Sequence, residues 1–197
     1  MITLIKGEIE ELNPAYAVIN CSGVGYHIAI SLSTFSSLQG KKNAVLHTKL
    51  IVREDAHLLY GFGLKEEREL FNLLISVAGV GPASGLITLS TLSIQQIINA
   101  IQNSDSKVLE SVKGIGSKTA QKIVIDLKDK INKNLDSFNK VIQINNKQET
   151  NKKKESLLAL ESLGVSSKQV EKLVDVFILN NSEATLEEII KGILKNL

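Results

Sequence analysis

The stretch Leu109–Ile131, LESVKGIGSKTAQKIVIDLKDKI, decides the fold of the helical part of this chain. Its centre is Gly114-Ile115-Gly116, and apolar residues lie on either side of it at helical spacing. These are Val108, Leu109 and Val112 before the centre, and Ala120, Ile123, Val124, Leu127 and Ile131 after it. Two glycines around one branched apolar residue allow a sharp turn, with the isoleucine packed between the helices. The stretch therefore predicts two helices joined by a tight turn.

The second of these helices is expected to begin at about Ser117, with an anion-binding end. A helix N-terminus carries unpaired N–H donors and a partial positive charge, so it favours an anion. Lys113, Lys118 and Lys122 surround that end, and the last two share a helix face because they are four residues apart. Phosphate is the ligand that this arrangement suits, and a nucleic-acid backbone supplies phosphates in series.

A second copy of the pattern, Ala78-Gly79-Val80-Gly81-Pro82-Ala83, lies 35 residues earlier. Pro82 falls at the first helical position, where its missing N–H removes no helical bond. The first copy alone fits equally well an αα-hairpin that only packs. Two copies, each flanked by amphipathic helices, indicate a tandem helix-hairpin-helix that binds the DNA backbone without reading bases. The predicted DNA-binding residues are Gly79, Val80, Gly81, Lys113, Gly114, Ile115, Gly116, Ser117, Lys118, Thr119 and Lys122.

Composition agrees with a DNA-backbone binder and argues against other classes. The net charge of the 197 residues is only +2, but residues 107–133 hold seven basic and three acidic side chains. Aromatic residues make up 4% of the chain and there is no Trp, so an aromatic platform for base stacking is not expected. Cys21 is the single cysteine, which excludes an internal disulfide and suits a reducing compartment. We find no leader and no long apolar run, so we expect a cytoplasmic protein with no membrane partner.

The N-terminal 62 residues are typical of a small β-barrel. Five short segments rich in β-branched residues alternate with turn signals such as Asn13-Pro14 and Ser22-Gly23, with a short helix at Ser33–Gln39. The predicted strands are Ile2–Glu11, Tyr16–Cys21, Gly25–Ile30, Val45–Val52 and Leu58–Phe62. A barrel of the OB type fits this pattern, and an SH3-like barrel is the alternative. By residue type alone, Arg53-Glu54-Asp55-Ala56 is a solvated hairpin turn.

The rest of the chain is predicted to be helical, with one polar interruption. Ser93 and Ser106 are the expected N-caps within the first helical region. Its helices are expected at Lys65–Val77, Pro82–Leu89, Ile94–Asn103, Lys107–Val112 and Ser117–Ile131. Residues 135–154 are rich in Asn, Lys and Gln and indicate a flexible linker. Residues 155–197 predict three amphipathic helices, with capping boxes at Ser166/Gln169 and Thr185/Glu188.

The sequence therefore predicts a multidomain α+β protein. Its domains are an OB-like barrel (1–63), a tandem helix-hairpin-helix domain (64–134), a flexible linker (135–154) and a three-helix bundle (155–197). A bundle so small at the end of a flexible linker is typical of a mobile interaction module. Neither a P-loop nor a carboxylate or Cys/His set at catalytic or metal-ligand spacing is present, so we expect no cofactor and no catalytic site.

Two motifs in this architecture resemble the RuvA family, the DNA-binding subunits of bacterial Holliday-junction branch-migration complexes. They are Ile51–Phe62, IVREDAHLLYGF, and Gly114–Ala120, GIGSKTA. The resemblance covers the whole chain, although the linker and tail are similar in architecture more than in sequence. Ala83 and Ser117 stand where the family often has Lys. Phosphate binding is therefore expected to depend more on backbone donors, Lys118 and Lys122.

The resemblance implies a function in homologous recombination and DNA repair. A homotetramer, single or paired with a second one, would hold a four-way junction open and square on a basic face. The tail would recruit the RuvB ATPase ring, making this chain the non-catalytic subunit of a helicase complex. Glu54 and Asp55 match the family's acidic pin near the tetramer centre. The resemblance therefore favours a pin at these two residues over the solvated turn that residue type alone indicates. Negative charge there would repel phosphates at the crossover.

A different class remains open at this point. A DNA-repair enzyme, such as a glycosylase or a nuclease, could use the same hairpins for docking. It would need a catalytic Asp or Lys in a pocket beyond the hairpin. Asp126 follows the second hairpin but has no partner set in the sequence, which favours a solvated helix residue. Cleavage of a junction or of damaged duplex by the pure protein would distinguish the two classes.

Overall fold

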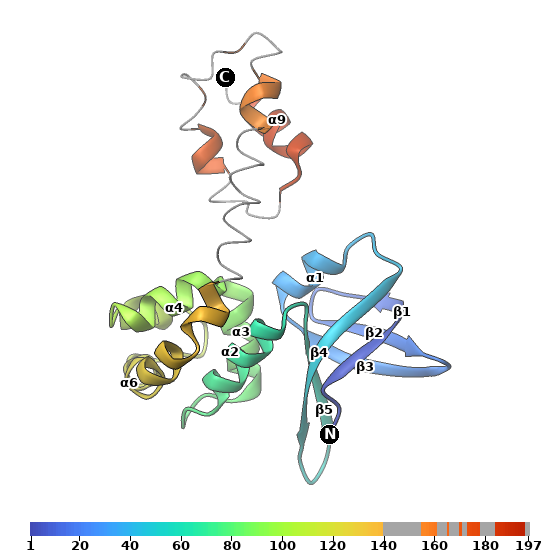
Figure 1. Cartoon of the computed structure of the whole chain (residues 1–197), viewed down its shortest axis with the longest axis vertical. Helices are drawn as coiled ribbons and strands as arrows, with labels where there is room; N and C mark the ends of the chain where they lie inside the picture. The colour runs from blue at the N-terminus through green and yellow to red at the C-terminus, as the bar shows by residue number, and fades with distance from the viewer. Residues whose placement is uncertain (140–154, 161–164, 166–169, 171–172, 178–183, 196–197) are drawn as a thin grey trace. The chain divides into compact units, whose positions relative to one another are not determined.

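The computed structural model describes residues 1–139, 155–160, 165, 170, 173–177 and 184–195. The chain forms two compact units, Met1–Phe138 and Asn139–Leu197. The first contains the β-barrel and the tandem hairpins, and the second contains the C-terminal helices (Figure 1). No helix among the described residues is both long and apolar enough to cross a membrane.

A closed five-stranded barrel of the OB type forms the N-terminal part of the first unit. Its strands are β1 (Leu4–Leu12), β2 (Tyr16–Cys21), β3 (Val24–Ile30), β4 (Asn43–Val52) and β5 (His57–Phe62), with α1 (Leu32–Leu38) between β3 and β4. The strand order is β1-β2-β3-β5-β4, and β4 closes on β1. Only the β3–β5 pair is parallel, and the other pairs are antiparallel. This topology confirms the OB-type prediction over the SH3-like alternative.

Alternation along the strands explains why this segment closes into a barrel. Successive side chains of a strand point to opposite faces, so every second apolar residue can enter one core. Those that do are Ile5, Ala17, Ile19, Ile28, Ile30, Ala44 and Leu46, each at most 4% exposed. β4 and β5 continue beyond the barrel as a long hairpin (Figure 1). The tip of this hairpin is held by a backbone bond from the N–H of Arg53 to the carbonyl of Ala56.

The helical part follows the predicted bounds closely. Its helices are α2 (Lys65–Ile75), α3 (Pro82–Thr91), α4 (Ile94–Gln102), α5 (Ser106–Glu110) and α6 (Ser117–Lys133). Ser93 caps α4 in a full capping box with Gln96, which confirms that prediction. The predicted cap at Ser106 is wrong. The cap is Asp105, whose carboxylate accepts from the N–H of Lys107 and so starts the helix one residue earlier.

The helical part is longer at its C-terminal end than the polar composition of the predicted linker suggested. Residues 135–139 are helical, and Phe138 is fully buried. Leu135 and Phe138 are three residues apart and so can share one face of a helical turn. The average composition of residues 135–154 is polar, so it does not reveal two apolar residues at helical spacing. The described helical part therefore continues past Asn134, and residues 140–154 of the predicted linker lie outside the described residues.

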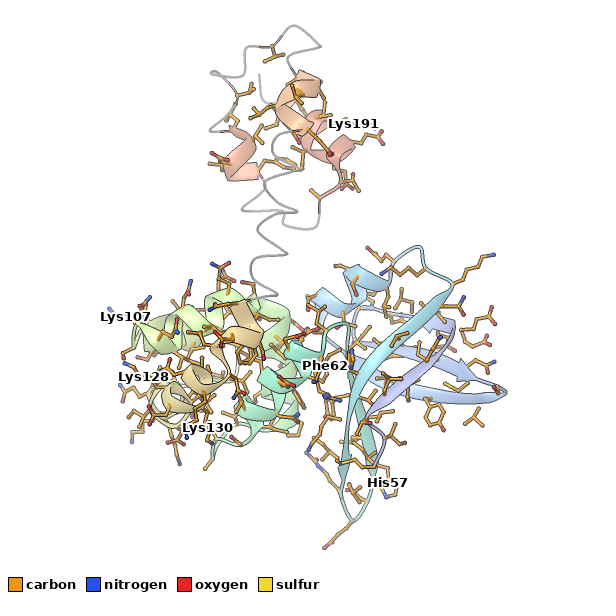
Figure 2. The ribbon with its side chains drawn as sticks, in the orientation of Figure 1. His57, Phe62, Lys107, Lys128, Lys130 and Lys191 are labelled. Atoms are coloured by element: carbon orange, nitrogen blue, oxygen red, sulfur yellow. The ribbon has the colours of Figure 1, made fainter. Side chains whose placement is uncertain are left out.

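The barrel and the helical part are joined by aromatic packing. Phe71 of α2 is fully buried, and its ring centroid lies 5.2 Å from that of Tyr60 and 4.9 Å from that of Phe62. Both partners come from β5, the last strand of the barrel. Figure 2 shows Phe62 at this junction. The first hairpin helix is thus fixed directly onto the barrel that carries the β4–β5 hairpin.

The second unit has its own small apolar core. Leu160, Val170, Val174, Ile189 and Ile193 are buried together. Residues 155–160 and 173–177 are helical, and α9 (Leu186–Leu194) begins with the predicted capping box of Thr185 and Glu188. Hydrogen bonds from the backbone N–H and the hydroxyl of Thr185 lower the pKa of Glu188. The other predicted box, Ser166/Gln169, lies outside the described residues.

Candidate DNA-backbone interface

The two predicted hairpins have the same backbone hydrogen bonds at an offset of 35 residues. In the first, Val80 N–H donates to the carbonyl of Val77 (3.0 Å); in the second, Ile115 N–H donates to Val112 (3.1 Å). The helices that follow begin in the same way. The N–H of Gly85 donates to the carbonyl of Gly81, and the N–H of Ala120 donates to the carbonyl of Gly116, both at 2.9 Å. The hydroxyls of Ser76 and Ser111 also donate to the carbonyls three residues earlier, each at 2.7 Å. The sequence repeat is therefore a repeat of structure.

The apolar tips of both turns point into the protein. Val80 is 5% exposed and Ile115 is 4% exposed. Their amide N–H groups are also occupied, by the carbonyls of Val77 and Val112. Of the predicted DNA-binding residues, these two shape the turn, and neither the side chain nor the amide is free to meet a ligand. Ile115 packs inside, as the sequence predicted.

The helices after both turns begin with free donors. α3 has Gly81 and α6 has Gly116 as N-cap, and neither has a side-chain cap, whereas α1, α4 and α5 are capped by Ser31, Ser93 and Asp105. In the part of the chain that the structure describes, no acceptor is assigned to seven amides at these two helix starts. They are those of Gly81, Ala83, Ser84, Gly116, Ser117, Lys118 and Thr119. Such donors carry a partial positive charge and fit the oxygens of an anion.

The two helix starts lie next to each other through a reciprocal contact. A Cβ placed on Gly79 would stand 3.7 Å from Oγ1 of Thr119, and one placed on Gly114 would stand 3.8 Å from Oγ of Ser84. Gly79 and Gly114 are equivalent in the repeat, and so are Ser84 and Thr119. Each turn therefore contacts the first turn of the other hairpin's second helix. This is the arrangement expected when two copies of a hairpin are related by an approximate two-fold axis.

Positive charge is unequal between the two hairpins. Lys113, Lys118 and Lys122 are all exposed around the second one. The equivalent positions of the first hairpin are Ala78, Ala83 and Ile87, so it contributes no cation of its own. One cation reaches it from α6, because Nζ of Lys130 lies 3.3 Å from Oγ of Ser76. The first hairpin thus offers mainly backbone donors, and the second offers donors and charge.

Glu54 and Asp55 occupy a separate place in the same unit. Both are exposed at the tip of the β4–β5 hairpin, beyond the last strand pair, Val52 with His57. Among the described residues no ion pair neutralises either carboxylate. No hydrogen bond or ion pair joins them to the hairpin turns in this part of the chain. The unit therefore carries two distinct features: paired donor turns on the helices and an acidic tip on the barrel.

Sequence reasoning missed the amide of Ser84 and the side chain of Lys130. The first could have been found from the 35-residue offset, because Ser84 is the counterpart of Thr119. The second could not, because Lys130 and Ser76 are 54 residues apart and meet only in the folded chain. No group of three or more His, Cys, Asp or Glu side chains within the described ranges could hold a metal ion.

An OB-like barrel followed by two matched helix-hairpin-helix turns with free amides defines a protein of the DNA-backbone-binding class. Comparison with known proteins gives the family. Residues 1–61 match the RuvA N terminal domain, and residues 71–129 match the SAM-like Helix-hairpin-helix tandem. The chain belongs to the RuvA family.

Several relatives match over the full length of both chains. Proteins from Christiangramia forsetii and Flavobacterium psychrophilum are 45% and 46% identical to this chain over 197 residues, covering 100% of each. One from Cytophaga hutchinsonii is 39% identical over 99% of each chain. All three carry the name Holliday junction branch migration complex subunit RuvA. The similarity thus includes the C-terminal unit, which neither matched domain family covers.

Proposed function

We propose that this protein is the DNA-binding subunit of a branch-migration complex and binds four-way DNA junctions. The observation that carries the proposal is the reciprocal packing of the two hairpin turns, Gly79 against Thr119 and Gly114 against Ser84. It sets two groups of free amides side by side, so that one DNA duplex can meet both. Phosphates contacted by backbone N–H groups carry no sequence information. A migrating junction presents changing sequence, which suits this kind of contact.

The proposed assembly is a homotetramer, with one copy for each arm of the junction. Four acidic hairpin tips, each carrying Glu54 and Asp55, would then meet near the four-fold axis. Their charge would repel phosphates within a Debye length of about 8 Å at physiological salt. Repulsion at the centre and donors along the arms would hold the junction open and square. A second tetramer on the other face of the junction would double the mass of the protein in the complex.

The C-terminal unit is proposed to recruit a RuvB-type ATPase ring. Support comes from its separate core of Leu160, Val170, Val174, Ile189 and Ile193 and from its division from the DNA-binding unit. The chain itself would be non-catalytic and cytoplasmic, and the ATPase would supply the work of branch migration. The DNA-repair enzyme considered above gains no support from the family assignment.

A gel-shift comparison tests the proposal. The purified protein is titrated against a four-way junction and against a linear duplex of one arm's sequence, at one fixed salt concentration. We expect clear preference for the junction, and light scattering of the complex should give a mass of four or eight copies. Equal affinity for both DNAs would contradict junction binding. Cleavage of either DNA would favour the repair-enzyme class instead.

A further inference from the structure

A buried carboxylate lies where the barrel meets the hairpin helices. Glu67, in the first turn of α2, is 5% exposed, and three hydroxyl groups donate to it. Ser31 and Ser33 each donate to Oε1 at 2.6 Å, and Thr34 donates to Oε2 at 3.1 Å. All three donors belong to the N-terminal end of α1, more than 30 residues earlier in the chain. Both carboxylate oxygens are thus used to hold a barrel element against a helix of the first hairpin.

Neighbouring hydrogen bonds extend this contact to the rest of the domain junction. The N–H of Gly63 donates to Oγ1 of Thr34 (3.0 Å), and the N–H of Leu32 donates to Oγ of Ser90 in α3 (3.1 Å). Gly63 has little room for a side chain, because a Cβ there would stand 3.2 Å from Oγ of Ser37. Both helices of the first hairpin, α2 and α3, are therefore bonded to α1. We call the bonds among Glu67, Ser31, Ser33 and Thr34 the Glu67 clasp.

The Glu67 clasp supplies direction that the aromatic packing of the junction lacks, and Arg68 of α2 adds one further bond, from Nη1 to the carbonyl of Thr3 (2.9 Å). One turn further along α2, Phe71 packs on Tyr60 and Phe62, and apolar packing of this kind is non-directional. Three donors on one buried carboxylate are satisfied in only a narrow range of orientations. No ion pair to Glu67 is found among the described residues, so its bonds are those to hydroxyls. The clasp therefore fixes the angle at which the helices meet the barrel.

We propose that Glu67 is a positioning residue, and that the Glu67 clasp sets the preference for four-way over linear DNA. The inference rests on the proposed function. The hairpin turns, which the clasp does not touch, would contact the backbone of either DNA. Selection of the junction over linear duplex also requires the tip with Glu54 and Asp55 to stand at a fixed place relative to those turns. Within the first unit, the path between the two features runs through the domain junction that Glu67 holds. Loosening it should therefore lower the ratio of junction to duplex affinity.

The test compares Glu67→Gln with Glu66→Gln. Both glutamates lie in the first turn of α2, so both variants remove the same charge at the same helix end. Only the first converts an acceptor of the clasp into an amide N–H₂ donor. We expect the ratio of junction to duplex affinity to fall about tenfold in Glu67→Gln, the size typical of removing one buried hydrogen-bond partner. Glu66→Gln should keep the ratio of the parent within about twofold.

A second pair of variants, with smaller changes, tests the proposal in case Glu67→Gln fails to fold. Ser33→Ala removes one donor to Glu67, and Ser36→Ala changes a serine of the same helix whose side chain makes no hydrogen bond to another described residue. The first should lower the ratio in the same direction as Glu67→Gln, by a smaller factor, and the second should leave it unchanged. Unchanged ratios in both Ser33→Ala and folded Glu67→Gln would overturn the proposal.

Amide hydrogen exchange without DNA gives a second readout. Peptides that contain Leu32, Thr34 and Gly63 should exchange faster in Glu67→Gln, while those from α4 keep the exchange rate of the parent. Faster exchange with an unchanged affinity ratio would mean that the clasp is purely structural, which contradicts the proposal. Unchanged exchange, or an equal fall of the ratio in Glu66→Gln, would also overturn it. Failure of the proposed function would be seen in the parent protein itself, which would then bind junctions and linear duplex equally well. In that case there would be no selectivity for Glu67 to set.

Discussion

Gly114 and Gly116 stand two residues apart in one turn, yet the fold demands glycine only at the first. Gly114 has a φ of +90°, a conformation that side chains disfavour. Gly116 has an ordinary φ of −82°, and a Cβ built on it would meet nothing within 4 Å. The same contrast holds in the first hairpin for Gly79 and Gly81. The space beside Gly116 is therefore open to an added side chain.

This contrast predicts opposite effects for two substitutions in the turn. Gly114→Ala should destabilise the protein by about 1–3 kcal/mol, because it forces a side chain into a strained φ. Gly116→Ser should leave stability unchanged or raise it, since serine is a better N-cap than glycine. Its hydroxyl would then occupy amide donors of α6 and weaken junction binding. Urea unfolding and gel shifts on both variants check this. A Gly116→Ser protein that binds like the parent would exclude this helix start from the interface.

The exposed lysines of the second hairpin should dominate the salt dependence of binding. Lys118→Ala with Lys122→Ala should weaken junction binding and reduce the slope of log K against log salt by about 2, one unit for each phosphate that is no longer neutralised. Lys41→Ala with Lys42→Ala, also exposed but on the barrel, removes the same charge and serves as control. Affinities measured over a series of salt concentrations give the slope. Equal slopes for the two double variants would show that only net charge matters.

The DNA-binding unit should function without the C-terminal unit if the chain is cut after Asn139. A protein ending at Asn139 is expected to fold, form tetramers and bind junctions, but not to stimulate the partner ATPase on junction DNA. A protein ending at Asn134 lacks the fully buried Phe138, and we expect it to be less stable by about 3–5 kcal/mol, as for other large core deletions. Thermal unfolding and ATPase assays separate the two. Normal stimulation by the shorter chains would give the C-terminal unit another role.

Charge at the tip of the β4–β5 hairpin should disfavour the wrong DNA. Glu54→Gln with Asp55→Asn keeps size and polarity but removes both charges. In the proposed tetramer the uncharged side chains would no longer repel phosphates, so linear duplex should bind more readily and junctions at least as tightly as before. Dissociation constants for both DNAs at one salt concentration measure the selectivity. Glu8→Gln with Glu11→Gln, on exposed β1 positions, is the matched control.

A contrary result for the acidic tip is equally clear. If the variant binds junctions more weakly and keeps its selectivity, Glu54 and Asp55 are turn residues or tetramer contacts. If Glu8→Gln with Glu11→Gln changes the selectivity to the same degree, the change in selectivity is caused by net charge and not by the position of the carboxylates at the hairpin tip.

Local pattern by itself determined most of the elements of this protein. Short runs rich in β-branched residues between turn signals predicted the five strands, and the i, i+3, i+4 spacing predicted the helices around Gly79 and Gly114, because both patterns depend on neighbours within a few residues. The caps at Ser93 and Thr185 were readable for the same reason. Where two eligible caps were adjacent, as at Asp105 and Ser106, residue type alone could not choose between them.

Tertiary structure decided what depends on residues far apart in the chain. The reciprocal contacts of Gly79 with Thr119 and of Gly114 with Ser84 span 30 to 40 residues, and the Glu67 clasp spans more than 30. Sequence reasoning also assigned Val80 and Ile115 as binding residues, whereas folding buries both side chains and occupies both amides. Burial and hydrogen-bond partners are properties of packing between elements, and no short window of sequence contains them.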